Sequence, residues 1–188
     1  MIPKGDKAEP LNTVEFVLLL TILTVANLVV SWYVSIKPRR YHGVYRFLSF
    51  ESILLLLLLC TPVWFVNPWS WNQLISWAML LASIPLPVYG FRALHSKGKP
   101  KGQFEDTTAL VTTGVYRHIR HPLYASLMLL GTGIFFKDIT VVTSFCAVVN
   151  IGALVATAKT EEGEMLEKFG EEYKRYMERT KMFVPFVI

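Results

Sequence analysis

Charged residues are scarce in this sequence and are absent from several long stretches. They make up 18% of the 188 residues, whereas hydrophobic residues make up 53%. The mean hydropathy is +0.40. A soluble domain of this size carries more charge and does not concentrate its apolar residues in long runs. The composition therefore excludes an ordinary soluble domain and predicts an integral membrane protein.

Cysteine is rare, and the short motifs of soluble enzymes are missing. Cys60 and Cys146 both lie inside apolar runs with no motif around them, so we expect inert thiols and neither a disulfide framework nor a metal site. The sequence contains no Gly-x-Ser-x-Gly, no phosphate-binding loop and no Gly-x-Gly-x-x-Gly. A nucleotide, if one binds, must then be held by helix ends and loops.

Five apolar segments are candidates to cross a bilayer at about 1.5 Å per residue. They are residues 16–36, 47–66, 74–94, 122–136 and 139–158. Pro85 and Pro87 should break the third segment, and the break either shapes a cavity or only optimises packing. Glu51 lies in the second segment, where a carboxylate is costly unless it is paired or close to the interface. It is therefore either a functional residue or an interfacial one.

The last two apolar segments should form a helical hairpin. Lys137 and Asp138 make a tight turn between them, and Gly131, Gly133 and Gly152 would permit close helix approach. From residue 160 onward, apolar residues recur at helical spacing with Glu and Lys between them, which predicts an amphipathic helix. These residues are Met165, Leu166, Phe169, Tyr173, Tyr176 and Met177.

The fold that we predict is a single all-α membrane domain over residues 1–188, with an exposed tail at residues 1–13. It has five transmembrane helices, of which the third is broken by prolines, plus a C-terminal cytosolic amphipathic helix. Every Lys and Arg except Lys4, Lys7 and Lys137 falls in regions that five spans place on one side. The positive-inside rule makes that side cytoplasmic, so we expect the N-terminus outside and the C-terminus inside. The net charge of +5 then reflects orientation in the bilayer, and no nucleic-acid partner is expected.

Residues 110–124 carry most of the candidate chemistry: two histidines, two arginines, two tyrosines, a glycine and a proline. Pro122 suits the first turn of a helix, which places His121 at or beside its cap. The N–H groups and positive end of a helix start suit a carboxylate or phosphate, and Arg117 and Arg120 would add positive charge. The alternative is that these cations are interfacial anchors. No metal is expected, because His118 and His121 lack a third ligand.

Glu161 and Glu162 stand at the end of the fifth apolar segment. Since a hairpin returns the chain to the membrane face that it left, we expect this pair to lie beside His121. A cationic helix start facing two carboxylates would match a zwitterionic amino acid attached to a nucleoside.

At these residues the chain resembles the integral membrane methyltransferases of the isoprenylcysteine carboxyl methyltransferase and phospholipid methyltransferase group. The shared pattern covers about the C-terminal half: Leu110-Val111-Thr112-Thr113-Gly114-Val115-Tyr116, Arg120-His121-Pro122-x-Tyr124, Glu161-Glu162, Phe169-Gly170-x-Glu172-Tyr173 and a late proline. The resemblance implies S-adenosylmethionine bound by residues 107–188 at the cytosolic face. It implies contacts from Thr108, Ala109, Leu110, Val111, Tyr116, His121, Pro122, Leu123, Tyr124, Glu161 and Glu162.

The resemblance also implies direct methyl transfer, without a metal, to a lipophilic small molecule or a lipid, with membrane lipids as further partners. Arg92 and Arg120 are the catalytic residues that we expect. The chain departs from the prenylcysteine enzymes where they carry an arginine before the paired glutamates. Thr157 stands there instead, which puts a carboxylate acceptor in doubt unless Lys159 or Arg92 substitutes. The acceptor atom is therefore left open.

Two alternative functions remain at this point. One is an NADPH-dependent intramembrane reductase of the sterol reductase type, whose members are usually longer. The other is a non-catalytic membrane binding protein, for which changing His121 or Glu161 would leave cofactor affinity untouched.

Overall fold

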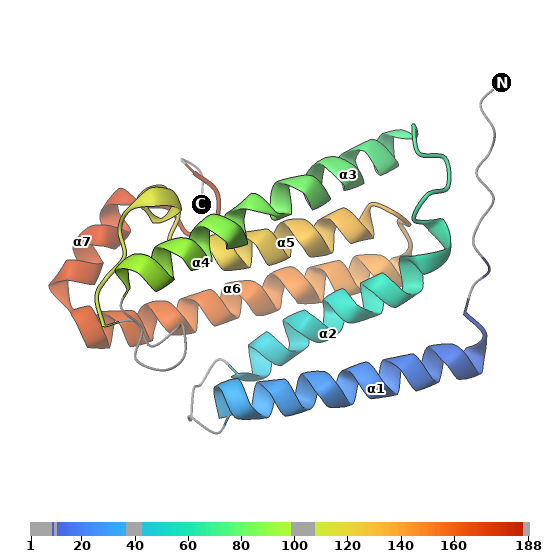
Figure 1. Ribbon diagram of the computed structural model, residues 1–188, viewed down its shortest axis with the longest axis horizontal. Helices are drawn as coiled ribbons and strands as arrows, with labels where there is room; N and C mark the ends of the chain where they lie inside the picture. The colour runs from blue at the N-terminus through green and yellow to red at the C-terminus, as the bar shows by residue number, and fades with distance from the viewer. Residues whose placement is uncertain (1–8, 10, 37–42, 99–107, 186–188) are drawn as a thin grey trace. The chain divides into compact units, whose positions relative to one another are not determined.

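The computed structural model describes residues 9, 11–36, 43–98 and 108–185 (Figure 1). Its helices are α1 (Thr13–Ser31), η1 (Trp32–Ile36), α2 (Gly43–Cys60), η2 (Thr61–Val63), α3 (Trp71–Ser83), α4 (Pro85–Lys97), η3 (Gly114–Arg117), α5 (Pro122–Phe135), α6 (Val141–Phe169) and α7 (Glu171–Arg179). Within the described ranges the only β-type pairing is an isolated bridge between Ile119 and Lys181. The all-α prediction is confirmed.

Four helical segments are long and apolar enough to cross a membrane: Thr13–Val34, Gly43–Val63, Trp71–Lys97 and Val141–Phe169. The helix α5 is apolar but has only 14 residues, which at about 1.5 Å each fall short of the other four. Five spans therefore stay a prediction. The predicted third span is interrupted at Ile84, since α3 ends at Ser83 and α4 starts at Pro85.

The last long helix extends further than predicted. We expected it to end near residue 158, but α6 continues to Phe169, because residues 159–169 contain no proline and many good helix formers. Gly170 then adopts a φ of +52°, which glycine tolerates and which ends the helix. The predicted amphipathic helix is confirmed in part. Its first residues, Met165, Leu166 and Phe169, belong to the continuation of α6. Its remainder is α7, whose Tyr173 and Tyr176 are buried while its charged residues face outward.

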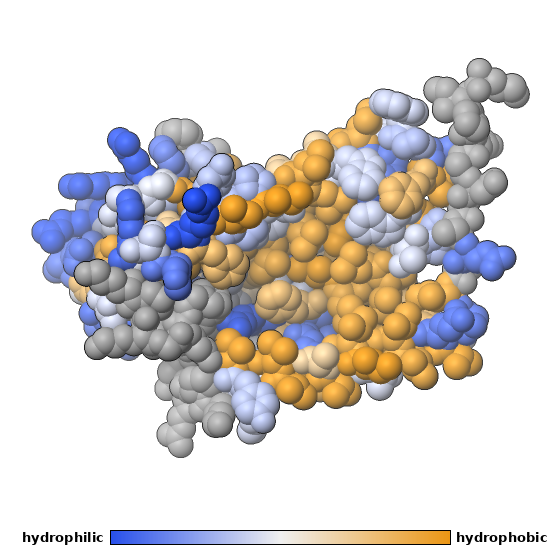
Figure 2. Space-filling view, in the orientation of Figure 1, coloured by the Kyte–Doolittle hydropathy of each residue, from blue (hydrophilic) through white to orange (hydrophobic). Residues whose placement is uncertain are grey.

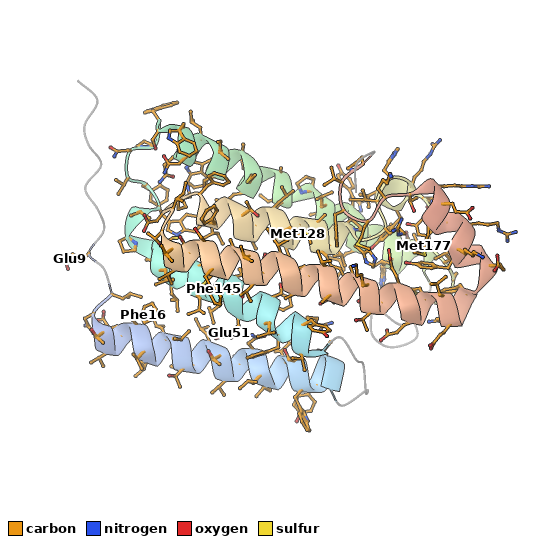
Figure 3. All side chains as sticks on the ribbon, turned by 180° about the vertical axis from the view of Figure 1, so that it is seen from behind. Glu9, Phe16, Glu51, Met128, Phe145 and Met177 are labelled. Atoms are coloured by element: carbon orange, nitrogen blue, oxygen red, sulfur yellow. The ribbon has the colours of Figure 1, made fainter. Side chains whose placement is uncertain are left out.

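The chain divides into two compact units, residues 1–80 with 128–157 and residues 81–127 with 158–188. In the first unit, α1 packs against α2. Many side chains along α1 are apolar and exposed, as a lipid-facing helix requires (Figure 2). Glu51 points from α2 toward α1 (Figure 3), where Thr24 Oγ1 donates to its carboxylate at 2.5 Å and Asn27 Nδ2 at 3.1 Å. The carboxylate is thus hydrogen-bonded between two helices.

The hairpin contact within the first unit depends on one glycine in particular. A Cβ added at Gly131 would lie 2.6 Å from Asn150 Oδ1, so α5 and α6 approach too closely there for a side chain. Gly133 similarly faces Leu80, at 3.1 Å from the added Cβ, whereas nothing lies within 4 Å of one added at Gly152. The expected close approach is confirmed at the first two glycines and wrong at Gly152, which points into open space.

Lys137 lies in the turn between α5 and α6 and is only 3% exposed. Its ammonium donates to Gln73 Oε1 at 2.8 Å and lies 3.7 Å from the centre of the Trp77 ring. Trp64 adds a backbone carbonyl at 3.4 Å. Neutral acceptors and an aromatic face therefore solvate this buried cation.

Candidate functional site

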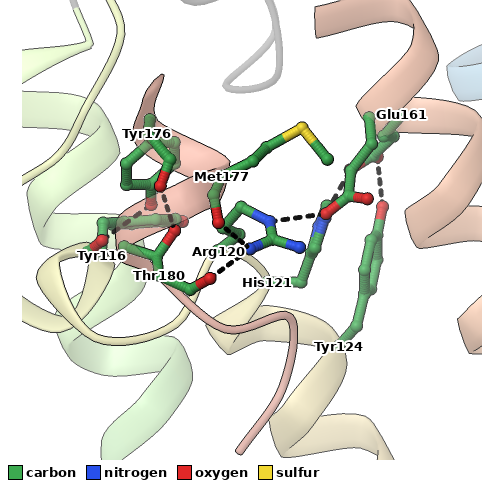
Figure 4. Close-up of polar contacts among 9 residues, drawn as sticks. Tyr116, Arg120, His121, Tyr124, Glu161, Tyr176, Met177 and Thr180 are labelled. Carbon is green, nitrogen blue, oxygen red and sulfur yellow. Dashed lines mark hydrogen bonds and ion pairs between the residues drawn. The ribbon is translucent and has the colours of Figure 1, made fainter. Parts of the chain in front are cut away.

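The second unit contains a polar cluster around the start of α5 (Figure 4). Pro122 is the first residue of that helix, a position where its missing N–H is no loss. The backbone just before it is held by the C-terminal segment, here residues 180–183. The N–H of Arg120 donates to the Lys181 carbonyl at 2.8 Å. The N–H of His121 donates to the Met182 carbonyl at 3.0 Å.

Arg120 is a buried connector in this cluster. Its Nε donates to Glu162 Oε1 at 2.6 Å, and the side chains of the two are 10% and 9% exposed. Its Nη1 donates to the carbonyls of Met177, at 3.2 Å, and of Thr180. Those carbonyls close the C-terminal end of α7, where a cation is favoured by the helix dipole. The guanidinium thus links α6, the end of α7 and the segment before α5.

His121 lies between the two glutamates. Its Nδ1 is 3.6 Å from Glu161 Oε2, and its Nε2 is 3.4 Å from Glu162 Oε1 without the alignment of a hydrogen bond. The ring stacks on Tyr124, with 16° between the planes, and Phe183 flanks it with the ring centres 6.0 Å apart. The buried Nε2 has no hydrogen-bond partner among the residues that the structure describes. A buried polar atom without a partner is a candidate to receive one from a ligand.

Glu161 is the most accessible charged member of the cluster, with its side chain 20% exposed. The hydroxyl of Tyr124 donates to its Oε1. Because neighbouring residues of a helix differ by about 100° in direction, Glu161 faces Tyr124 and Nδ1 of His121, whereas Glu162 faces Arg120. The adjacent carboxylates therefore have different surroundings.

Two tyrosines support the cluster as neutral groups. Tyr176 on α7 donates its hydroxyl to the carbonyl of Tyr116 at 2.7 Å. Burial raises the pKa of both phenols above the ordinary value, and the nearby Glu161 raises that of Tyr116 further. They act as uncharged hydrogen-bonding groups at neutral pH and fix η3 against α7.

Arg92 lies elsewhere in the same unit, on the last turns of α4. It is exposed and lines an open groove of about 690 Å³, together with His95 and Lys97 from α4 and Thr113 and Gly114 at η3. Lys97 Nζ donates to Thr113 Oγ1 at 2.7 Å, which holds η3 to the helix end. The groove is therefore cationic.

Side-chain or backbone contacts bring together six of the predicted site residues: Tyr116, Arg120, His121, Tyr124, Glu161 and Glu162. The predicted proximity of His121 and Glu161 is confirmed. Pro122 and Leu123 instead pack against α4, where a Cβ added at Gly90 would lie 3.0 Å from Leu123. Thr108 and Ala109 fold back on the end of α4, with their N–H groups donating to the Gly98 carbonyl. Leu110 is half-buried and Val111 buried, and neither makes a polar contact with the cluster in the described contacts.

Sequence reasoning missed the contribution of the C-terminal segment. Met177 and Thr180 supply carbonyls to Arg120, and Phe183 packs on the His121 ring. The helical spacing of Tyr173, Tyr176 and Thr180 was the available signal, since it puts the three on one face of α7 and its end. It indicated a covered surface but not which side chain it covers.

The chain matches the phospholipid methyltransferase family over residues 71–172, which is more than half of it and confirms the resemblance described above. A methanethiol S-methyltransferase from a Pseudomonas species is 24% identical over 169 residues, covering 82% of this chain and 64% of that relative. Methanethiol S-methyltransferase 1 from Bradyrhizobium diazoefficiens is 34% identical over 76 residues, covering 38% of this chain and 25% of that relative. The chain thus spans less than two thirds of the length of the relatives it matches.

Proposed function

Because the chain belongs to the phospholipid methyltransferase family, we propose that it transfers a methyl group from S-adenosylmethionine to a lipophilic acceptor, with the cofactor bound at the cytosolic face. The observation that carries the proposal is the contact of His121 with Glu161 and Glu162 at the start of α5. It gathers in one compact unit the residues on which the sequence resemblance depends.

The donor set in this cluster fits such a cofactor. Glu161 is partly exposed and acidic, as a ribose hydroxyl or an ammonium group requires. His121 has a buried nitrogen without a described hydrogen-bond partner. These two residues and Tyr124 would hold the polar parts of the cofactor. The segment from Thr108 to Val111, with Tyr116, Pro122, Leu123 and Glu162, completes the proposed site.

The sulfonium of S-adenosylmethionine supplies a methyl group that is already activated for transfer. The protein must therefore align the reacting groups and exclude water, and needs neither a metal nor a covalent enzyme intermediate. The buried positions of His121 and Glu162 support water exclusion behind the site. Arg92, exposed in the cationic groove of the same unit, would orient a polar or acidic end of the acceptor. We further propose that the helix break at Pro85 and Pro87 shapes the entrance for the acceptor.

The acceptor is proposed as a class and not as one molecule. The two relatives named above are methanethiol S-methyltransferases, so a small apolar thiol belongs beside membrane lipids among the candidates. Both partition into a bilayer and both satisfy the description of a lipophilic nucleophile. The acceptor atom stays open.

The decisive experiment titrates the purified protein with S-adenosylhomocysteine and with NADPH in calorimetry. We expect saturable binding of S-adenosylhomocysteine alone. Binding of NADPH alone would instead support the intramembrane reductase, and binding of neither would support a non-catalytic protein. Incubation with methyl-labelled S-adenosylmethionine, membrane lipids and a series of thiols would then identify the product that carries the label.

A further inference from the structure

We infer that Tyr176 is a positioning residue for the proposed cofactor site, and that it acts by holding η3 in place from the side of α7. The residue acts through the backbone of Tyr116 and does not itself touch the ligand. The inference rests on the proposed function for the identity of that ligand. It adds a residue to the site, since the pattern shared with the family includes Tyr173 but not Tyr176.

The element η3, Gly114–Arg117, is too short to fix its own position. A single 3-10 turn has weak internal hydrogen bonds, and short helices are marginal without tertiary contacts. At its end, the N–H groups of His118 and Ile119 both donate to the Val115 carbonyl, at 3.1 and 3.2 Å. Contacts with other elements must therefore determine where η3 lies.

Within the described residues, two side-chain hydrogen bonds hold η3 and the residue before it, one from each side. On the side of α4, the exposed Lys97 donates to Thr113 Oγ1 at 2.7 Å. On the side of α7, the Tyr176 hydroxyl donates to the Tyr116 carbonyl at 2.7 Å, and these two residues are only 8% and 7% exposed (Figure 4). Because water competes with the first bond and not with the second, the Tyr176 bond contributes more to the position of η3.

The contacts of Tyr176 separate positioning from ligand binding. A neutral phenol has one proton to donate, and that of Tyr176 goes to a backbone carbonyl. The ring packs against Tyr173 with the ring centres 5.8 Å apart, and the backbone carbonyl of Tyr176 accepts from Thr180 Oγ1 at 2.7 Å. The residue is thus fixed within α7, and its hydroxyl is engaged by η3.

The position of η3 matters because this element connects two parts of the proposed site. The segment from Thr108 to Val111 precedes it, Tyr116 lies within it, and His121 follows it. A displaced η3 would move the first segment relative to His121. Binding groups that are already in place cost less to order when the ligand arrives, so the displacement should lower cofactor affinity.

The test compares Tyr176→Phe with the wild-type protein in S-adenosylhomocysteine calorimetry, at a temperature where both are folded. The substitution keeps the ring and removes the hydroxyl, so the Tyr116 carbonyl loses its donor. We expect the dissociation constant to rise roughly 3- to 10-fold, the range that loss of one hydrogen bond produces. A role in stability alone would lower the melting temperature but would leave the affinity of the folded protein unchanged.

Tyr173→Phe is the matched control, because Tyr173 is buried on the same helix and no hydrogen bond from its hydroxyl is found in the described part of the chain. It should bind S-adenosylhomocysteine as the wild type does. An equal loss of affinity in Tyr173→Phe would indicate loosened packing of α7 and overturn the inference. Unchanged affinity in Tyr176→Phe, with or without a lower melting temperature, would overturn it as well.

Limited trypsin digestion without ligand separates this inference from the proposed function. Arg117 is exposed at the end of η3, so release of this element should speed cleavage after Arg117 in Tyr176→Phe, as measured by mass spectrometry of the fragments. If the wild-type protein binds no S-adenosylhomocysteine, the proposed function fails, but faster cleavage in Tyr176→Phe is still expected. Cleavage at the same rate in Tyr176→Phe, Tyr173→Phe and the wild type would mean that the hydroxyl does not hold η3. The digestion also works on isolated membranes, so it applies to a variant that purifies poorly.

Discussion

Two buried cations flank α5 in the sequence, and their surroundings differ. Arg120, just before the helix, pairs with the Glu162 carboxylate and with two carbonyls at the end of α7. Lys137, just after the helix, is held by the Gln73 side chain, one carbonyl and the Trp77 ring, and no ion pair is found for it in the described part of the chain. Each lies in a different compact unit.

The difference shows what a guanidinium can do that an ammonium cannot. Arginine presents several donors in a rigid fork, so it can join a carboxylate and two backbone segments at once, whereas lysine is a compact point charge. Arg120 therefore pairs with the Glu162 carboxylate, which also lies 3.4 Å from His121 Nε2. The charge of Lys137 only secures a turn. We expect ligand affinity to depend on the surroundings of Arg120. The surroundings of Lys137 should affect only the stability of the protein.

The largest effect on ligand affinity should come from changing Glu161, the more accessible carboxylate, which lies next to the Arg120–Glu162 ion pair. Glu161→Gln removes a charged acceptor, and hydrogen bonds to charged groups contribute about 1.5–3 kcal/mol, so S-adenosylhomocysteine affinity should fall roughly 10- to 100-fold. Calorimetry measures it. Glu167→Gln, at an exposed position of the same helix, is the control and should bind normally. Unchanged affinity in Glu161→Gln would remove the residue from the site.

Gly131→Ala tests whether the stability of the first unit depends on the close packing of α5 against α6. The added methyl group would lie 2.6 Å from Asn150 Oδ1, in a contact buried between α5 and α6. Overpacking of this kind destabilises a protein by about 1–3 kcal/mol, so the melting temperature in detergent should fall. Gly152→Ala, which meets nothing within 4 Å, should not lower it. A fall in melting temperature as large in Gly152→Ala as in Gly131→Ala would contradict the clash with Asn150 as its cause.

Lys137→Met tests whether the burial of Lys137 among neutral groups makes the stability of the protein depend on pH. Burial lowers the pKa of Lys137 from 10.5 to about 8. Between these values the unfolded chain binds the extra proton, so the stability of the wild-type protein should gain from rising pH across that window. The melting temperature of Lys137→Met relative to wild type should therefore decline as the pH rises from below about 8 to about 10.5. A difference that does not vary with pH would contradict the lowered pKa. Ligand affinity should be unchanged throughout.

The smallest effect should come from Glu51→Gln. The carboxylate accepts from Thr24 and Asn27, and an amide can keep only one of these two acceptor positions. Hydrogen bonds between membrane helices average about 0.6 kcal/mol, so a slight fall in melting temperature with unchanged turnover is expected. A strong loss of turnover would instead make Glu51 a functional residue, as the sequence left open.

Particular residues show how far prediction from the sequence reached. The apolar runs predicted the long helices, because a bilayer requires about 20 apolar residues in a row whatever their order. Pro122 predicted the start of α5, and Gly170 ends α6 where its positive φ is tolerated. The hairpin argument predicted that His121 and Glu161 are neighbours, since a turn at Lys137 brings one helix back along the other. The end of α6 was misjudged by eleven residues, from Ala158 to Phe169, because a change to polar residues ends a membrane segment but not a helix.

The sequence by itself determined that the chain is helical, that its apolar helices can cross a bilayer and that its charged motifs gather in the C-terminal half. These properties follow from composition and spacing along the chain. Only the tertiary structure decided which of two adjacent glutamates faces Arg120, which carbonyls of α7 its guanidinium binds and which aromatic ring covers His121. Such pairings depend on helix rotation and on where a short terminal segment folds back, and no local pattern of residues specifies either one.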